Sequence, residues 1–158
     1  MLSVFSVVNC FFLEQIVFNP SREQVRLFFC EAWRKHRARL ILEGAEVTAA
    51  GLIEQHPEYH ALLENPDAAV AQEFTPEGGQ MNPFLHLSLH LAIADQISID
   101  QPPGIRAAYQ ALRQRLEVHD AEHAVLECLG EALWHAQQNG GAIDAELYLE
   151  NVRRAASR

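Results

Sequence analysis

The stretch "NPFLHLSLHLAIADQ", from Asn82 to Gln96, decides the fold class of this chain. An asparagine cap followed by a proline in the first turn is the residue pair that typically opens an α-helix. Between Pro83 and Asp95 the only polar side chains are two histidines and a serine. A helix that is apolar on nearly every side is expected to be buried. We therefore predict a buried helix that opens at Asn82 and Pro83 and runs to about Ile99.

Helical periodicity recurs along the rest of the chain, interrupted by capping residues, prolines and glycines. We expect Asn19 to cap the first helix, with Pro20 in its first turn. The expected segments run from Pro20 to about Leu40, through one kinked or two short helices around "HPEYHALLEN", from Asn65-Pro66 to about Phe74, over "IRAAYQALRQRLE", from His119 to about Asn139, and over "DAELYLENVRRAA" with Asp144 as its cap. The pattern predicts an all-α fold, a single-domain bundle of about five to seven helices over residues 17–156.

Composition and charge limit the classes of function. Of the 158 residues, 49% are hydrophobic and 21% are charged, which are values typical of globular proteins. The net charge of -9 argues against a protein that binds duplex nucleic acid, because such proteins neutralise phosphates with Lys and Arg. The basic run "RKHRARL", from Arg34, ends the first predicted helix, where positive charge interacts favourably with the helix dipole. We interpret this run as a solvated turn, with contact to a small anion or RNA as the alternative.

Cysteine usage and the N-terminal stretch indicate the compartment. Cys10, Cys30 and Cys128 are odd in number and form no CxxC pair, so we interpret them as thiols in a reducing compartment. The opening "MLSVFSVVNCFFLEQIVF" has no basic region, carries Glu14, and is too short to span a bilayer, which argues against a signal peptide or an anchor. We expect a cytoplasmic protein with no membrane or nucleic-acid partner, and leave a homodimer open.

The eight histidines are clustered in sequence. His56/His60, His86/His90 and His119/His123 are three pairs at a spacing of four, whereas random placement of eight histidines predicts about 0.4 such pairs. Residues four apart share one side of a helix, so two imidazoles can converge on one metal ion. Glutamates extend two of the pairs by another turn. The predicted ligands are His86, His90, His119, His123 and Glu127, with His56, His60 and Glu64 as secondary candidates.

Such a donor set indicates a transition metal. Imidazole and carboxylate groups from facing helices suit iron, manganese or zinc, and helical bundles build metal sites from side chains of this kind. Oxygen or hydrolytic chemistry would require an open coordination position. "HDAEH" matches the H-x-x-E-H arrangement of one zinc-protease class, but five residues are weak evidence. We assign no catalytic residue, and whether the chain is an enzyme stays open.

Structural roles for the same histidines are the competing interpretation. The two histidines of the buried helix fit core residues that are hydrogen-bonded, since burying an unsatisfied polar group costs about 1–3 kcal/mol. His56, beside Pro57, fits a capping or turn residue. His119 and His123 fall on the polar side of their predicted helix. On this interpretation the protein is a non-enzymatic structural or protein-interaction module.

Five motifs also carry a resemblance to a known family. "FNPSREQVRLFFCEAW", "HPEYHALLE", "NPFLHLSLHLAI", "SIDQPPGIR" and "ECLGEALW" resemble the bacterial family domain of unknown function 1841, over Phe18 to about Arg154. The resemblance implies a small cytoplasmic bacterial protein and carries over no catalytic residues. Members of that family typically begin with Met directly before Phe-Asn-Pro, where this chain has Val17. We therefore expect residues 1–16 to be a non-native extension that arises from a misassigned start codon.

Overall fold

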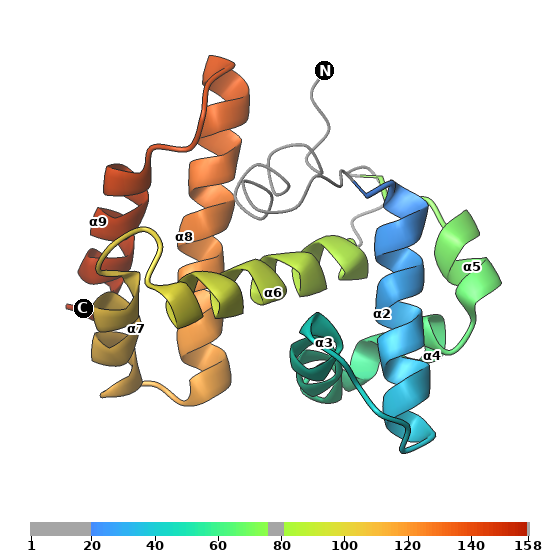
Figure 1. The fold of residues 1–158 in the computed structure, drawn as a ribbon. Helices are drawn as coiled ribbons and strands as arrows, with labels where there is room; N and C mark the ends of the chain where they lie inside the picture. Colours follow the sequence, from blue (N-terminus) through green and yellow to red (C-terminus); the bar gives the residue numbers. More distant parts are fainter. Residues whose placement is uncertain (1–19, 76–80, 158) are drawn as a thin grey trace. The chain divides into compact units, whose positions relative to one another are not determined.

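The computed structural model describes residues 20–75 and 81–157, and every regular element in these two stretches is helical (Figure 1). They contain eight α-helices, one short 3-10 helix and no strand. The all-α class is thus confirmed. The helices slightly outnumber the five to seven expected, because prolines at 57 and 66 divide one region into several short segments. The predicted extension over residues 1–16 and the predicted start at Val17 lie outside the described residues.

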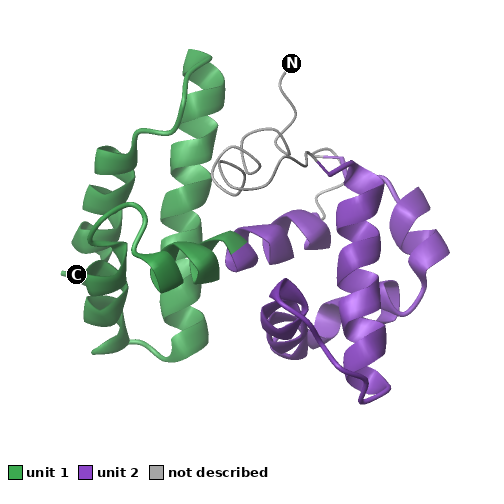
Figure 2. Ribbon diagram, viewed as in Figure 1, with its two compact units in different colours: residues 1–16, 92–158 green, residues 17–91 purple. Residues whose placement is uncertain are grey.

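The helices form two compact units (Figure 2). The N-terminal unit comprises Val17–Leu91, and the C-terminal unit includes Ala92–Arg158. The boundary falls within α6 (Pro83–Ile99), so residues of one helix belong to both units. The expectation of a single domain over residues 17–156 stays a prediction.

The helix α2 (Arg22–Arg37) begins two residues later than expected. The prediction that Asn19 caps this helix, with Pro20 in its first turn, is wrong. Its N-cap is Ser21, whose hydroxyl oxygen accepts from the backbone N–H of Gln24 at 3.2 Å. The Gln24 side chain accepts in return from the backbone N–H of Ser21 at 2.7 Å. This reciprocal capping box satisfies the backbone N–H groups of both Ser21 and Gln24, and so fixes the start of the helix at Ser21.

In the N-terminal unit α2 packs against three shorter helices, α3 (Ala45–Glu54), α4 (His60–Leu63) and α5 (Pro66–Ala71). The 3-10 helix η1 (Pro57–Tyr59) joins α3 to α4. Apolar side chains from these helices and from α6 form one buried core. Its members are Phe29, Cys30, Ala32, Trp33, Ala49, Leu52, Ile53, Leu63, Ala69, Phe84 and Leu87.

One charged side chain is buried in the same unit. Arg26 donates through Nη1 to three carbonyl oxygens at the C-terminal end of α5, at distances of 2.7 to 3.0 Å. Its guanidinium also lies over the rings of Phe74 and Phe84. Burial lowers the pKa of this guanidinium. Because these carbonyls have no partner within their own helix, Arg26 both caps α5 and fixes it to α2.

Helix α6 begins where the sequence predicted. The side-chain oxygen of Asn82 accepts from the backbone N–H groups of Phe84 and Leu85, at 3.0 and 3.3 Å. Phe84, Leu87 and Ile93 are fully buried along its length. The expectation of a buried helix capped by asparagine is therefore confirmed.

The C-terminal unit contains α7 (Ile105–Arg113), α8 (Val118–Asn139) and α9 (Ala145–Ala156), with α9 packed against both of the others. The predicted end of α8 at about Asn139 and the predicted cap of α9 are both confirmed. Gly140 ends α8 in the left-handed conformation, at φ 61°, which glycine adopts without strain. The Asp144 carboxylate accepts from two backbone N–H groups in the first turn of α9.

Two of the three cysteines lie in the described stretches. Cys30 and Cys128 are free and buried, while Cys10 lies outside the described residues. Burial raises the pKa of the Cys30 thiol to about 11. In residues 20–75 and 81–157, no helix has the length and apolar character needed to cross a membrane.

Candidate metal centre

His56 lies at a break between two helical segments of the N-terminal unit. It follows the end of α3 and directly precedes η1, and its backbone at φ -124° and ψ 66° is not helical. Its Nδ1 lies 2.8 Å from the carbonyl oxygen of Leu52. A carbonyl can only accept, so the imidazole hydrogen is on Nδ1 and Nε2 presents a lone pair. The break thus supplies a histidine whose tautomer suits metal binding through Nε2.

Two more imidazoles come from α6, where His86 and His90 are one turn apart. Their ring centres lie 4.8 Å from each other. The ring centre of His56 lies 4.8 Å from that of His86 and 4.9 Å from that of His90. The three centres therefore form a nearly equilateral triangle. The exposed fractions of these residues are 2%, 5% and 1%, so this three-histidine cluster of His56, His86 and His90 is buried.

One nitrogen separation in the three-histidine cluster matches that between two ligands of a metal ion. One ring nitrogen from each residue lies within 4.8 Å of the others. The Nε2 atoms of His56 and His86 are 3.0 Å apart. Two nitrogens bound at about 2.1 Å to one ion are about 3.0 Å apart at a right angle and about 3.4 Å apart at the tetrahedral angle. The separation between His56 and His86 therefore falls at the lower end of this range.

Tyr59 forms one wall of the three-histidine cluster. Its ring lies parallel to that of His56, with centres 5.5 Å apart and an angle of 2°, and meets the ring of His86 edge-on at 5.9 Å. Burial raises the pKa of the Tyr59 phenol, and the neighbouring Glu58 raises it further. The phenol therefore stays protonated in neutral solution, and its ring acts as an apolar wall that holds the His56 imidazole in place.

The secondary candidates His60 and Glu64 lie apart from the three-histidine cluster. His60 Nε2 is 2.8 Å from the carbonyl oxygen of Ile53, and its ring stacks on Trp33 at 4.2 Å. Glu64 is paired with Arg37 at 2.8 Å. Because Pro57 starts a new segment, His56 and His60 do not belong to one continuous helix, and they contact different neighbours.

The other predicted ligands lie on α8 in the C-terminal unit. His119 and His123 are one turn apart, with ring centres separated by 4.3 Å. Glu127 follows one turn later and is exposed. Their spacing on a single helix is as expected, and their part in metal binding stays a prediction.

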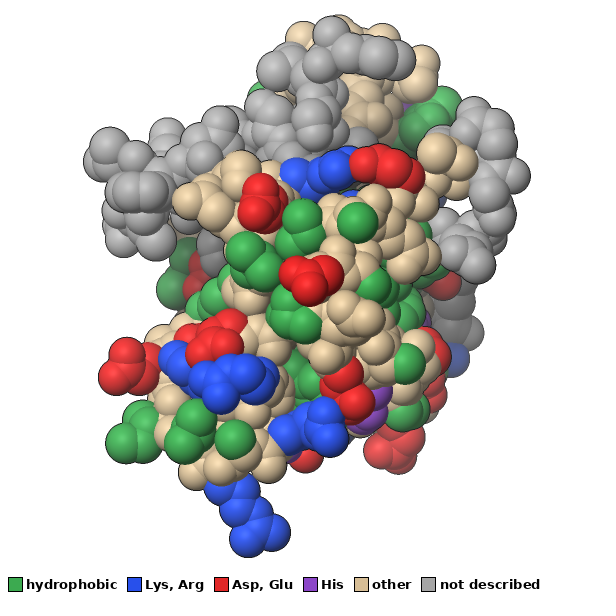
Figure 3. Space-filling view, turned by 90° about the vertical axis from the view of Figure 1, so that its right-hand side faces the viewer, with side chains coloured by type: hydrophobic (Ala, Val, Ile, Leu, Met, Phe, Trp, Pro, Cys, Tyr) green, Lys and Arg blue, Asp and Glu red, His purple; other side chains and the backbone are tan. Residues whose placement is uncertain are grey.

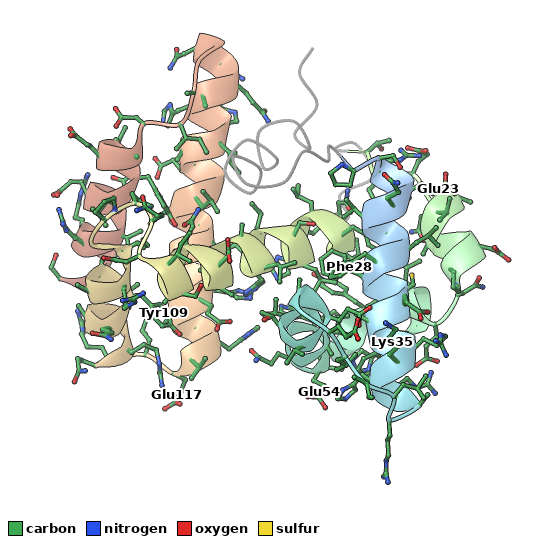
Figure 4. The ribbon with its side chains drawn as sticks, viewed as in Figure 1. Glu23, Phe28, Lys35, Glu54, Tyr109 and Glu117 are labelled. Atoms are coloured by element: carbon green, nitrogen blue, oxygen red, sulfur yellow. The ribbon has the colours of Figure 1, made fainter. Side chains whose placement is uncertain are left out.

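The basic run at the end of α2 lies among acidic side chains. Lys35 Nζ is 2.6 Å from Glu46, and this bond holds the pKa of the Glu46 carboxyl below its ordinary value. Figure 4 labels Lys35 near the end of α2, and on the face drawn in Figure 3 basic side chains lie beside acidic ones. The other pairs of the run are Arg34 with Glu31, His36 with Glu54 and Arg37 with Glu64. These contacts are those of a solvated, ion-paired turn.

The fold and the site define an all-α protein with a buried cluster of three histidines. The family model described as Domain of unknown function (DUF1841) matches residues 21–154, and the chain belongs to this family. Neither a curated protein nor a solved structure matches the chain. The expected resemblance is therefore confirmed.

The sequence pattern predicted two contributors to the cluster incompletely. It indicated His56 only as a secondary ligand candidate, and it did not indicate Tyr59. The signal that could have found them is Pro57, which breaks the helix and directs the preceding side chain away from the following segment.

Proposed function

We propose that this protein binds a transition-metal ion through Nε2 of His56, His86 and His90. The observation that carries the proposal is the triangle of buried imidazoles, with ring centres 4.8 to 4.9 Å apart. The bond between His56 Nδ1 and the Leu52 carbonyl supports it further. Metal-binding histidines characteristically donate their second ring N–H to a carbonyl or carboxylate, which orients the ring and fixes the tautomer.

The donor set favours metals that accept imidazole. Neutral imidazole suits zinc and iron, whereas manganese prefers oxygen donors, so zinc and iron lead among the three metals expected from the sequence. The resemblance to a bacterial family supports a site of action in the bacterial cytoplasm. No reaction is assigned to the centre.

His119, His123 and Glu127 remain proposed as additional ligands on the strength of their helical spacing. Substitution distinguishes their contribution to metal binding from that of the three-histidine cluster. Loss of metal in His123→Ala as well as in His90→Ala would support a site with ligands from α8. Loss in His90→Ala alone would confine the site to the N-terminal unit.

A structural role for the same histidines is the second candidate, and one contact favours it. His86 Nε2 lies 3.0 Å from His56 Nε2, which is a hydrogen-bond distance. Since His56 carries its hydrogen on Nδ1, His86 donates in this arrangement and no ion is needed to satisfy either nitrogen. On this account the bond ties α6 to the end of α3.

Elemental analysis tests the proposed function. Untagged protein purified without added metal should contain zinc or iron in a ratio to chain that approaches one. His90→Ala should lose that metal, while His60→Ala, a matched substitution of a histidine outside the cluster, should retain it. Circular dichroism of each variant checks that the helices persist. Traces of metal that do not change in His90→Ala would favour the structural role.

A further inference from the structure

A groove in the N-terminal unit is lined by α2, the end of α4 and the start of α5, which lie beside one another (Figure 1). Its apolar lining includes Leu27, Trp33, Leu63 and Pro66, and its volume is about 510 Å³. Binding sites in proteins commonly have volumes of about 300–1,000 Å³. The groove is therefore large enough to receive apolar side chains of a partner, which would also cover Leu27, now 39% exposed.

Two apolar side chains project from the turn that follows α2. Leu40 is 49% exposed and Ile41 is 83% exposed, and this pair is here called the apolar knob. Two hydrogen bonds fix the turn. The backbone N–H of Arg39 donates to the His36 carbonyl at 3.0 Å, and the next N–H donates to the Lys35 carbonyl at 2.9 Å. Arg39 has φ 55°, which completes a Schellman motif in a conformation that residues other than glycine rarely adopt. The apolar knob is therefore held in one shape before it meets a partner, which lowers the cost of binding.

The charges around the groove are balanced in sign. Arg34 pairs with Glu31 at 2.7 Å and Arg37 pairs with Glu64 at 2.8 Å, and all four residues line the groove. Their side chains are 41% to 58% exposed, so they remain accessible to a partner. The whole chain has a net charge of -9, and two copies repel each other wherever acidic surfaces meet. A rim of alternating sign avoids this repulsion, and a second copy offers the same alternation to complement it.

We propose that this surface binds a second copy of the chain, with the apolar knob of each copy seated in the groove of the other. Ala38 lines the groove and lies two residues before Leu40, so the knob and the groove are neighbours on the surface. In a twofold dimer both copies use the same patch, and neighbouring features of opposite shape can then be exchanged. The dimer goes beyond the proposed function, because the knob and the groove contain no histidine of the three-histidine cluster.

Sedimentation velocity of the full chain over a range of concentrations tests the proposal, with chelator present to exclude any effect of metal. The wild-type chain should approach twice the mass of one chain as its concentration rises. Ile41→Asp should raise the dissociation constant of the dimer by at least about a hundredfold, because two buried isoleucines are lost per dimer. Ile99→Asp is the matched control, since Ile99 is also exposed, at 59%, and lies outside the surface, so the dimer should be unchanged.

A mixture of two variants tests the exchange itself. Leu27→Lys places a charge in the groove and should weaken the dimer as Ile41→Asp does. Each variant alone lacks both contacts between knob and groove, whereas a mixed dimer keeps one, formed by the intact groove of Ile41→Asp and the intact knob of Leu27→Lys. Mixing should therefore restore part of the dimer, which it could not do if the variants had failed to fold. Circular dichroism of each variant checks that the helices persist.

Three results would overturn the proposal. A wild-type chain that stays monomeric at every concentration would do so, whether the groove then receives residues 1–19 of the same chain or a different protein. A dimer that neither Ile41→Asp nor Leu27→Lys weakens would show that the copies associate through another surface. A mixture that restores no dimer would contradict the exchange of knob and groove.

Discussion

Removal of the His56 side chain is expected to abolish stabilisation of the protein by zinc. A ligand that binds only the folded state adds about 2.7 kcal/mol to the free energy of unfolding when its free concentration is 100 times its dissociation constant. His56→Ala removes one of three ligands, together with the bond to the Leu52 carbonyl that orients it. The zinc-dependent increment in this variant should therefore approach zero.

The substitution also affects the protein without metal, and the two effects must be separated. His56 loses its contacts with Leu52 at 2.8 Å and with His86 at 3.0 Å, each worth about 1 kcal/mol, so the metal-free variant should be about 2 kcal/mol less stable. The comparison that matters is between the same variant with zinc and with chelator. Urea unfolding followed by circular dichroism at buffered free zinc provides both values.

His60→Ala is the matched control for this experiment. His60 contacts the Ile53 carbonyl and stacks on Trp33, so its loss should lower stability to a similar extent without metal. Its zinc-dependent increment should equal that of the wild-type chain. Equal increments in His56→Ala and the wild type would refute the assignment of His56 as a ligand.

Other predictions test the fold around the site. Leu63→Ala, in the buried core, should lower the free energy of unfolding by about 2–5 kcal/mol in urea titrations, and a loss well below this range would contradict its placement. Asp144→Ala removes the cap of α9 and should cost about 0.5–2 kcal/mol, with Asp144→Asn restoring most of it. The pKa of Cys30 is raised from 9.0 to about 11 in the folded chain, so its stabilising contribution is complete below pH 9.0 and is lost as the pH rises toward 11. The urea midpoint of the wild-type chain should fall over that interval, and the fall should be smaller in Cys30→Ala. An equal fall in both proteins would show that the thiol contributes nothing.

Local signals predicted most helix boundaries. Asn82 with Pro83, and Asp144 before α9, act through hydrogen bonds to backbone groups two or three residues away, so the sequence contains all the information needed. The start of α2 was misplaced because two polar residues compete there as caps. Ser21 has Gln24 three residues later, and that reciprocal pair decides the position.

The composition of the three-histidine cluster could be predicted only in part. The spacing of His86 and His90 places both on one side of α6, because a continuous helix repeats every 3.6 residues. The same spacing misleads for His56 and His60, which are separated by the proline that starts η1. That His56 rather than His60 approaches α6 depends on tertiary packing between α6 and the end of α3, which local periodicity does not encode.

X-ray absorption at the zinc edge of the metal-loaded wild-type chain tests the central claim most directly. The account predicts a shell of nitrogen atoms at about 2.0–2.1 Å, with multiple scattering from three or more imidazole rings around each ion. A shell composed mainly of oxygen or sulfur atoms, or scattering from fewer than three imidazoles, would contradict the assignment of His56, His86 and His90 as the ligands.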